Sequence, residues 1–155
     1  MNETSDRAPA QCACTIRAPM HGDCGRMAEL AGQLGYPSTA DQVRARLSEI
    51  RDSKECAIYV ADLSDGQVGG WIGVYIFRSV EMDKLAEING LVVGEEIRSR
   101  GIGRVLLAAA EKWARDRGCA TISVHSNVKR ERAHDFYKRN GYEWHKTQES
   151  FRKHL

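Results

Sequence analysis

The stretch that decides the fold is Leu91-Val-Val-Gly-Glu-Glu-Ile-Arg98-Ser-Arg-Gly101-Ile-Gly103-Arg104, in which an apolar strand leads into a helix. The helix predicted from Gly101 carries one apolar stripe at helical spacing, formed by Ile102, Val105, Leu106, Ala109, Ala110, Trp113 and Ala114. Gly118 is the expected end of this helix, and the short apolar segment 119–124 predicts a strand after it. A strand, a helix and a second strand in this order predict a right-handed parallel crossover, which is typical of an α/β domain.

The loop between the strand and the helix has the composition of an anion site. Backbone N–H groups at a helix start have no partner within the helix, and the helix dipole adds positive charge there. Glycines at 101 and 103 leave room for an anion, while Arg98, Arg100 and Arg104 add charge, so the loop predicts a pyrophosphate cradle. It is not a Walker P-loop, because no Gly-Lys-Ser/Thr follows, and it lacks the third glycine of the dinucleotide fingerprint. On these residues alone, the alternative to an anion site is a loop that binds no ligand, in which the glycines only make the turn easier to form.

The flanking segments predict further strands and helices. Strand-forming residues occupy 15–17, 56–63, 68–77 and 85–93, and Ser64-Asp65-Gly66-Gln67 predicts a hairpin turn. Helices are expected after an N-cap at Asp23, after Ser38 or Thr39, and around Ala133, Phe136 and Tyr137, the last ending at Gly141. The final segment, 142–155, is expected to add one or two strands.

Length and composition restrict the classes of protein. The 155 residues suit one domain, expected over 13–155 after a flexible tail at 1–12. With 23 basic and 21 acidic residues the net charge is +2, which argues against nucleic acid as the default partner. The five cysteines lack zinc-site spacing, so we expect no metal and reduced thiols. No apolar run approaches the ~18–20 residues of a membrane span, and residues 1–11 are too polar for a secretory signal, which favours a cytoplasmic protein.

Two motifs at matched separation carry a family resemblance. The first is Leu91-x-Val93 followed by Arg98-x-x-Gly101-x-Gly103; the second is Ser126-Asn127 with Ala133-His-Asp-Phe-Tyr-Lys-Arg-Asn-Gly-Tyr142. In these motifs the sequence resembles the GCN5-related N-acetyltransferase (GNAT) family over nearly its whole length. It departs from the family at Gly94-Glu95, where Asp-Pro is frequent, and at Ser99, where glycine is common. The resemblance implies a mixed, mostly antiparallel central sheet flanked by about four helices, with splayed strands forming an acetyl-CoA cleft.

The resemblance also implies roles for residues at the cofactor. Backbone groups of Leu91, Val92 and Val93 would pair with the pantetheine arm, and the N–H of Val93 would polarise the thioester carbonyl. The pyrophosphate would be held by backbone N–H groups of Arg98, Ser99, Arg100, Gly101, Ile102, Gly103 and Arg104. Asn127 would contact the cofactor arm, with a turn or cap residue as the alternative, and Tyr137 would lie near the sulfur.

Acetyl transfer to an amine requires a base that removes a proton from the amine and an acid that protonates the leaving thiolate. A lysine-like amine with a pKa of about 10.4 must lose a proton before it attacks, and a phenol with a pKa of about 10 can protonate the departing thiolate. Tyr137 is the candidate acid, with a core aromatic as the alternative. Glu87 is the candidate base, because strand alternation places it on one face with Asn89, Leu91 and Val93 if no bulge intervenes. A carboxylate that binds substrate or faces solvent is the alternative. His125 and His134 are weaker candidates, and His134 is interpreted as a surface residue.

The function that follows is acetyl-CoA-dependent N-acetylation, by direct transfer in a ternary complex. A small-molecule amine is the favoured acceptor, and a protein N-terminus or lysine is the alternative. A non-catalytic coenzyme A-binding sensor or interaction module is the alternative of another class. We expect the aromatic residues Tyr36, Trp71 and Tyr75 to contact the acceptor, with a position in the core as the alternative. The acidic pair Glu81 and Asp83 is also expected to attract a cationic amine. A homodimer is expected from the resemblance only.

Overall fold

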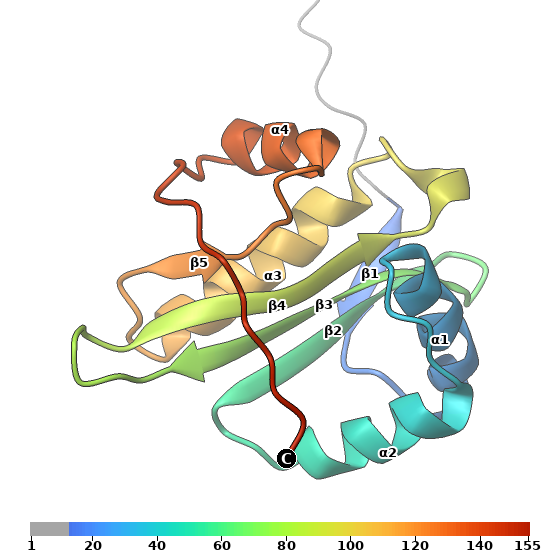
Figure 1. Ribbon diagram of the computed structural model, residues 1–155. Helices are drawn as coiled ribbons and strands as arrows, with labels where there is room; N and C mark the ends of the chain where they lie inside the picture. Colours follow the sequence, from blue (N-terminus) through green and yellow to red (C-terminus); the bar gives the residue numbers. More distant parts are fainter. Residues whose placement is uncertain (1–12) are drawn as a thin grey trace, which may run out of the picture. The chain divides into compact units, whose positions relative to one another are not determined.

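The computed structural model describes residues 13–155, which form two compact units, one ending at Val124 and the other spanning His125–Leu155 (Figure 1). The predicted tail lies outside the described residues, and the single-domain boundary stays a prediction.

The first unit is built on one five-stranded sheet in the order β1-β2-β3-β4-β5. Neighbouring strands from β1 to β4 pair antiparallel, while β4 and β5 pair parallel. The strands are β1 (Cys14–Arg17), β2 (Cys56–Leu63), β3 (Val68–Phe77), β4 (Leu85–Val93) and β5 (Ile122–Val124). The helices of this unit are η1 (His21–Asp23), α1 (Cys24–Gln33), α2 (Ala40–Ile50), η2 (Glu95–Ile97) and α3 (Ile102–Asp116), and α4 (Glu131–Arg139) lies in the second unit. The mixed, mostly antiparallel sheet is confirmed.

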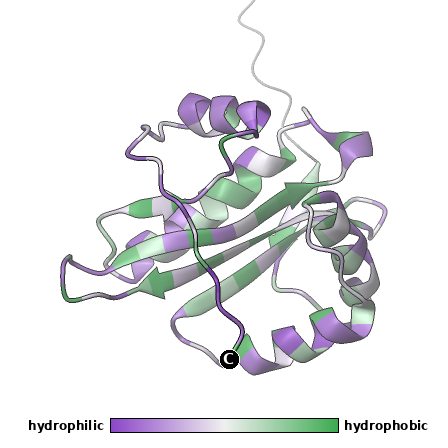
Figure 2. Cartoon of the chain, viewed as in Figure 1, coloured by the Kyte–Doolittle hydropathy of each residue, from purple (hydrophilic) through white to green (hydrophobic). Residues whose placement is uncertain are grey.

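Helices cover both faces of this sheet, with α1 and α2 on one face and α3 on the other (Figure 1). The α1 side holds a buried cluster that includes Met27, Leu30, Val60 and Val92. On the other side α3 buries Ile102, Leu106, Leu107, Ala110, Trp113 and Ala114. Five of these belong to the predicted stripe; its other members, Val105 and Ala109, are half-buried, and Leu107 is buried in addition. Figure 2 shows apolar residues concentrated in the strands and α3, whereas α4 is largely hydrophilic and buries none of its residues.

A β-bulge interrupts β4 at Asn89. Gly73 of β3 pairs with Gly90, but the next residue, Val74, pairs with Ile88, so Asn89 is an extra residue on β4. Its side chain bends over Gly73, where an added Cβ would lie 2.3 Å from the Asn89 Oδ1. One extra residue reverses the alternation of side chains along the rest of a strand.

The bulge separates side chains that a regular strand would hold together. Trp71 packs against the α1-side cluster, and alternation along β3 places Tyr75, and with it its partner Glu87, on that same face. Val93 pairs with Gly70, whose Cβ position faces Leu106 of α3, so Val93 and Leu91 turn to the opposite face. The prediction that Glu87, Asn89, Leu91 and Val93 share one face is therefore wrong.

Two predictions near the carboxyl end also differ from the structure. The strand predicted at 119–124 forms only over Ile122–Val124. Residues 142–155 form no strand. Trp144, Phe151 and Leu155 are 75%, 89% and 115% exposed, so these apolar side chains bury little surface that could offset the entropy of ordering a strand.

The two N-caps expected from the sequence behave differently. Thr39 caps α2 as predicted, since its side chain accepts from the Gln42 N–H while the Gln42 side chain accepts from the Thr39 N–H. Asp23 occupies the N-cap position of α1, but it makes no side-chain cap. Its buried carboxylate instead accepts from Arg17 Nη1 at 2.7 Å, Arg17 Nη2 at 3.1 Å and the Met20 N–H at 2.6 Å.

We expect Asp23→Asn to lower the free energy of unfolding by about 2–3 kcal/mol near neutral pH, because it removes charged hydrogen bonds from a buried ion pair. Arg17 holds the pKa of Asp23 in the folded protein below its usual value. The stabilisation is therefore fully present above the pKa that Asp23 has in the unfolded chain, and it is lost as the pH falls through the pKa that Asp23 has in the folded protein. Denaturant unfolding at neutral and acidic pH measures both effects. Asp41→Asn, in an exposed pair with Arg44, is the control and should cost under about 1 kcal/mol. Equal losses in the two variants would contradict the prediction.

Candidate active site

The loop before α3 has the backbone of a tight anion-binding turn. Ser99 and Gly101, on either side of Arg100, both adopt left-handed conformations, with φ of 65° and 84°. A left-handed backbone suits glycine, which explains why glycine is common at the position of Ser99. Gly101 is the N-cap of α3 and no side chain caps the helix, so the first N–H groups of α3, at residues 102–104, have no partner within the helix.

The three arginines of this loop are placed differently. Arg98 is half-buried, and its Nε donates to the Val93 carbonyl at 3.4 Å while its Nη2 lies 3.6 Å from Glu95. Arg100 and Arg104 are exposed. The positive charge that was predicted for the loop is therefore present at its surface, and Arg98 ties the loop back to the end of β4.

The second half of β4 presents an open backbone edge. The Gly94 N–H donates to the Gly69 carbonyl at 2.9 Å, so by alternation the N–H and C=O groups of Val93 and Leu91 point away from β3. On that outer side β5 pairs only with Ala86–Ile88. Among residues 13–124, no strand pairs with the outer edge of β4 beyond Ile88, and an extended ligand can form hydrogen bonds there.

Glu87 and Tyr75 form a hydrogen-bonded pair across β3 and β4. The Tyr75 hydroxyl donates to Glu87 Oε1 at 2.7 Å, and both residues are half-buried. Burial, together with the neighbouring carboxylate, raises the pKa of Tyr75 to about 12, so its hydroxyl keeps its proton. The pair thus offers a carboxylate acceptor held in a fixed orientation. Sequence reasoning chose both residues but not their contact.

The other candidate acceptor residues are dispersed. Trp71 donates its ring N–H to the Met27 carbonyl at 3.3 Å and packs over Gly90, which supports the core interpretation. Tyr36 is 67% exposed between α1 and α2, and the acidic residues Glu81 and Asp83 are exposed in the β3–β4 loop.

The second unit contains Asn127 in a turn before α4. Its Oδ1 accepts from the Lys129 N–H at 3.0 Å, and its carbonyl accepts from the Arg130 N–H at 3.0 Å. A ring nitrogen of His134 lies 2.9 Å from the same carbonyl, so this half-buried histidine is part of the turn rather than a free surface group. The turn alternative for Asn127 is therefore realised, and its role at the cofactor stays a prediction.

Tyr137, also in the second unit, packs with one aromatic ring of α4 and one that follows the helix. Its ring meets Phe136 edge-on at 5.3 Å between centroids and Tyr142 at 5.4 Å. Burial raises the pKa of Tyr137 to about 12, against a smaller opposite effect of Arg130. The phenol is therefore protonated across the physiological pH range and can act as a proton donor. Tyr137 is half-buried, so part of its side chain is accessible.

One residue pair was missed by sequence reasoning, because it joins segments 70 positions apart. Arg26 of α1 forms an ion pair with Glu96 of η2, next to the loop before α3. The bulge did have a local signal, since Gly90 follows Asn89 inside a strand and glycine in a strand often marks a bulge. Across residues 13–155, no three His, Cys, Asp or Glu side chains gather to hold a metal, and no helix is long and apolar enough to cross a bilayer.

Comparison with known proteins gives consistent matches. The family model described as "Acetyltransferase (GNAT) family" matches residues 27–142. The chain is 30% identical to an aminoglycoside N(6')-acetyltransferase type 1 of Stenotrophomonas maltophilia, over 84% of this chain and 87% of that protein. It is 38% identical to an aminoalkylphosphonate N-acetyltransferase of Salmonella typhimurium, over 73% and 71% of the two chains.

A solved structure of the aminoglycoside N-acetyltransferase AAC(6')-Iy in complex with CoA superposes with a TM-score of 0.80. The match covers 96% of this chain and 99% of that chain at 21% identity, and it confirms the predicted fold class. Together with the family match and the two relatives, the chain belongs to the GNAT family and is an acetyltransferase.

Proposed function

We propose that this acetyltransferase uses acetyl-CoA to acetylate the primary amine of a small molecule, by direct transfer in a ternary complex. The observation that carries the proposal is the continuity of two features. The open edge of β4 at Leu91 and Val93 runs directly into the glycine- and arginine-containing turn at the start of α3. An extended amide-containing arm ending in a pyrophosphate matches this order of binding groups.

The residues present fit coenzyme A at both ends of this surface. The outward N–H and C=O groups of Leu91 match the amides of the pantetheine arm, while Val93 offers its N–H, because its carbonyl already accepts from Arg98 Nε. Free N–H groups at the start of α3, with Arg100 and Arg104 exposed beside them, match two phosphates. The structural neighbour in complex with CoA supports the same assignment. When bound, acetyl-CoA supplies the activated acetyl group.

Each reacting step has a candidate group in this chain. Glu87 accepts the proton of the attacking amine, directly or through water, with Tyr75 holding its carboxylate. The outward N–H of Val93 stabilises the oxyanion. Tyr137 donates a proton to the departing thiolate, since its phenol carries that proton across the physiological pH range.

Direct transfer is favoured over a covalent enzyme intermediate by the state of the nearest thiol. Cys56 pairs with Tyr75 across the sheet and is the described cysteine closest to Glu87 in the strand register. Burial raises the pKa of this thiol, which keeps it from forming the thiolate that a nucleophile needs.

A small-molecule acceptor is favoured by the relatives, which are named for aminoglycosides and aminoalkylphosphonates. The protein is incubated with acetyl-CoA and one amine at a time from a panel. A thiol reagent measures the coenzyme A released and mass spectrometry the acetylated amine, and we expect the two amounts to rise in proportion. The panel holds an aminoglycoside, an aminoalkylphosphonate, a polyamine, an amino acid and a peptide with a free N-terminus and lysine. Turnover on the peptide alone would support the protein-acceptor alternative. Tight coenzyme A binding with no turnover on any amine would favour the sensor.

We expect Glu87→Gln to lower kcat about 30-fold, because the amide cannot accept the amine proton. Tyr75→Phe should lower kcat about 5-fold, since it removes one hydrogen bond that orients the carboxylate. Steady-state kinetics with a fixed acceptor measures both. Tyr59→Phe is the matched control, because Tyr59 is a half-buried strand tyrosine that pairs with Ile72 and so lies on the α3 face. Unchanged kcat in Glu87→Gln would show that water alone serves as the base.

A further inference from the structure

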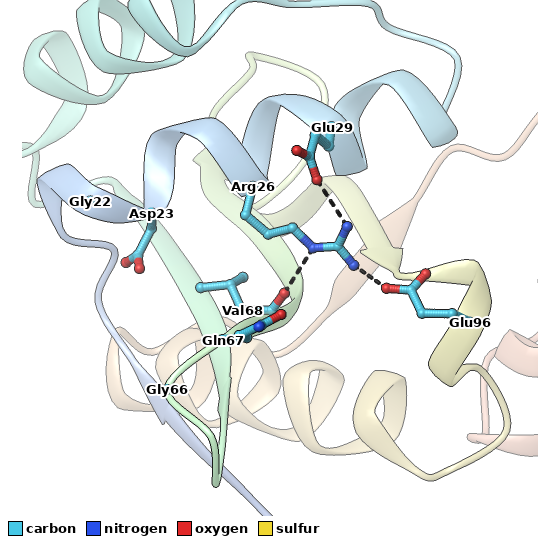
Figure 3. A pocket seen from close by; sticks show the side chains of 8 residues that line it. All are labelled: Gly22, Asp23, Arg26, Glu29, Gly66, Gln67, Val68 and Glu96. Atoms are coloured by element: carbon cyan, nitrogen blue, oxygen red, sulfur yellow. Dashed lines mark hydrogen bonds and ion pairs between the residues drawn. The ribbon is translucent and has the colours of Figure 1, made fainter.

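Arg26 of α1 lies in a polar pocket of about 410 Å³ beside η2 and the β2–β3 turn (Figure 3). Its three guanidinium nitrogens all have protein partners. Nε donates to the Val68 carbonyl at 3.2 Å, Nη1 to Glu29 at 3.0 Å, and Nη2 to Glu96. A guanidinium engaged in this way joins α1, β3 and η2, because each of its three nitrogens donates to a protein group.

Two side chains of α1 hold η2. Besides the Arg26–Glu96 pair, Gln33 Oε1 accepts from the backbone N–H of Glu95 at 3.1 Å. Residues 26 and 33 are separated by seven positions, which places them on one face of the helix. The segment just before the loop is therefore attached to α1 at two points, about two helical turns apart.

Gly94 lies directly beside this ion pair. A Cβ added at this buried glycine would lie 2.8 Å from Arg26 Nη2 and 2.7 Å from Glu96 Oε1, so the ends of both side chains would have to shift. Gly94 is one of the positions where this chain departs from the Asp-Pro frequent in the family. The absence of a side chain at Gly94 therefore leaves the space in which the Arg26–Glu96 ion pair lies.

The other side of η2 is also packed. The Ile97 Cδ1 atom lies 2.8 Å from where a Gly69 Cβ would be, so Ile97 rests directly on β3. Arg98, the next residue, begins the run of backbone N–H groups proposed to hold the pyrophosphate. The start of that run is consequently fixed between α1 and the sheet.

We propose that Arg26 is a positioning residue for the cofactor loop. Its contacts with Glu96, permitted by Gly94, hold η2 so that the N–H groups of the loop are already placed when coenzyme A arrives. This proposal rests on the proposed use of acetyl-CoA. Preorganisation of a binding loop raises affinity because less ordering remains to be done on binding.

The test is the dissociation constant for coenzyme A, measured by calorimetry on the full chain. Arg26→Met and Glu96→Gln should each weaken binding about 10-fold, and the double variant should be no weaker than either alone. Gly94→Ala should act in the same direction. Kinetics should show a raised KM for acetyl-CoA with kcat and the KM for the amine unchanged. A role in folding alone would not produce this pattern.

Arg44→Met is the matched control, because Arg44 forms an i,i+3 pair with Asp41 on α2, away from η2. The proposal is overturned if Arg26→Met binds coenzyme A as tightly as the unmodified chain. It is also overturned if the double variant loses as much binding free energy as the two single variants together. If Arg26→Met does not fold, Glu96→Gln decides, since its side chain is 53% exposed. Failure of the unmodified chain to bind coenzyme A would instead overturn the proposed function, and the positioning role with it.

Discussion

Replacing Gly101 by aspartate should raise the dissociation constant for coenzyme A about 100-fold or more, because a carboxylate would then stand at the start of α3. Two effects act together. The negative charge repels a pyrophosphate at the N-terminus of the helix, where the free N–H groups and the helix dipole favour an anion. In addition, φ at this position is 84°, a conformation that strains any residue with a Cβ.

Matched variants separate charge from strain. Gly118, after the carboxyl end of α3, has φ of 71° and only the flexible Lys84 side chain within 4 Å of its Cβ position, so Gly118→Asp imposes a similar strain at the opposite end of the helix. We expect Gly118→Asp to lower stability but leave coenzyme A binding intact, and Gly101→Ala to show an intermediate loss. Calorimetric titration at fixed salt measures all three. An unchanged dissociation constant in Gly101→Asp would mean that the pyrophosphate is not held at this loop.

Tyr137→Phe should lower kcat about 100-fold while the dissociation constant for coenzyme A stays within about twofold. The substitution removes only the hydroxyl, so the aromatic packing with Phe136 and Tyr142 is kept. The acid is active when protonated, and a pKa of about 12 extends that form upward in pH. The unmodified enzyme should therefore lose no activity through Tyr137 between neutral pH and about pH 10.

Tyr142→Phe is the control for this variant and should leave kcat unchanged. Tyr142 packs on Tyr137 and also carries a phenol hydroxyl, so this variant removes the same group from a neighbouring ring. Pre-steady-state and steady-state thiol release, with cofactor binding measured in parallel, distinguish the outcomes. A collapse of cofactor binding in Tyr137→Phe would give this residue a structural role. Unchanged turnover would mean that another group protonates the thiolate.

The predictions that succeeded depend on local patterns. The apolar stripe of α3 repeats at helical spacing, and Thr39 is followed three residues later by Gln42, so both helices are visible in short windows of sequence. The hairpin between β2 and β3 follows from its turn residues. The turn before α3 has left-handed backbone at Gly101, as its glycines suggested, while the role of the Arg98–Arg104 loop as an anion site stays a prediction.

The predictions that failed depend on contacts with distant residues. A regular strand would have put Glu87 beside Leu91, but packing of Asn89 over Gly73 inserts a bulge and moves Glu87 to the α1 face. Asp23 had the residue type of an N-cap, yet Arg17 from β1 takes its carboxylate. The one or two strands expected at 142–155 are absent, and Trp144, Phe151 and Leu155 are exposed.

The sequence by itself determined the order of elements, the strand-to-helix crossover and the glycine-arginine loop, because these depend on neighbours within a few positions. Only the tertiary structure decided which face Glu87 occupies, that Tyr75 holds its carboxylate, and that Arg26 reaches Glu96 past Gly94. These features arise where strands and helices from separate parts of the chain pack together. Their geometry depends on register and close approach, which residue spacing alone does not specify.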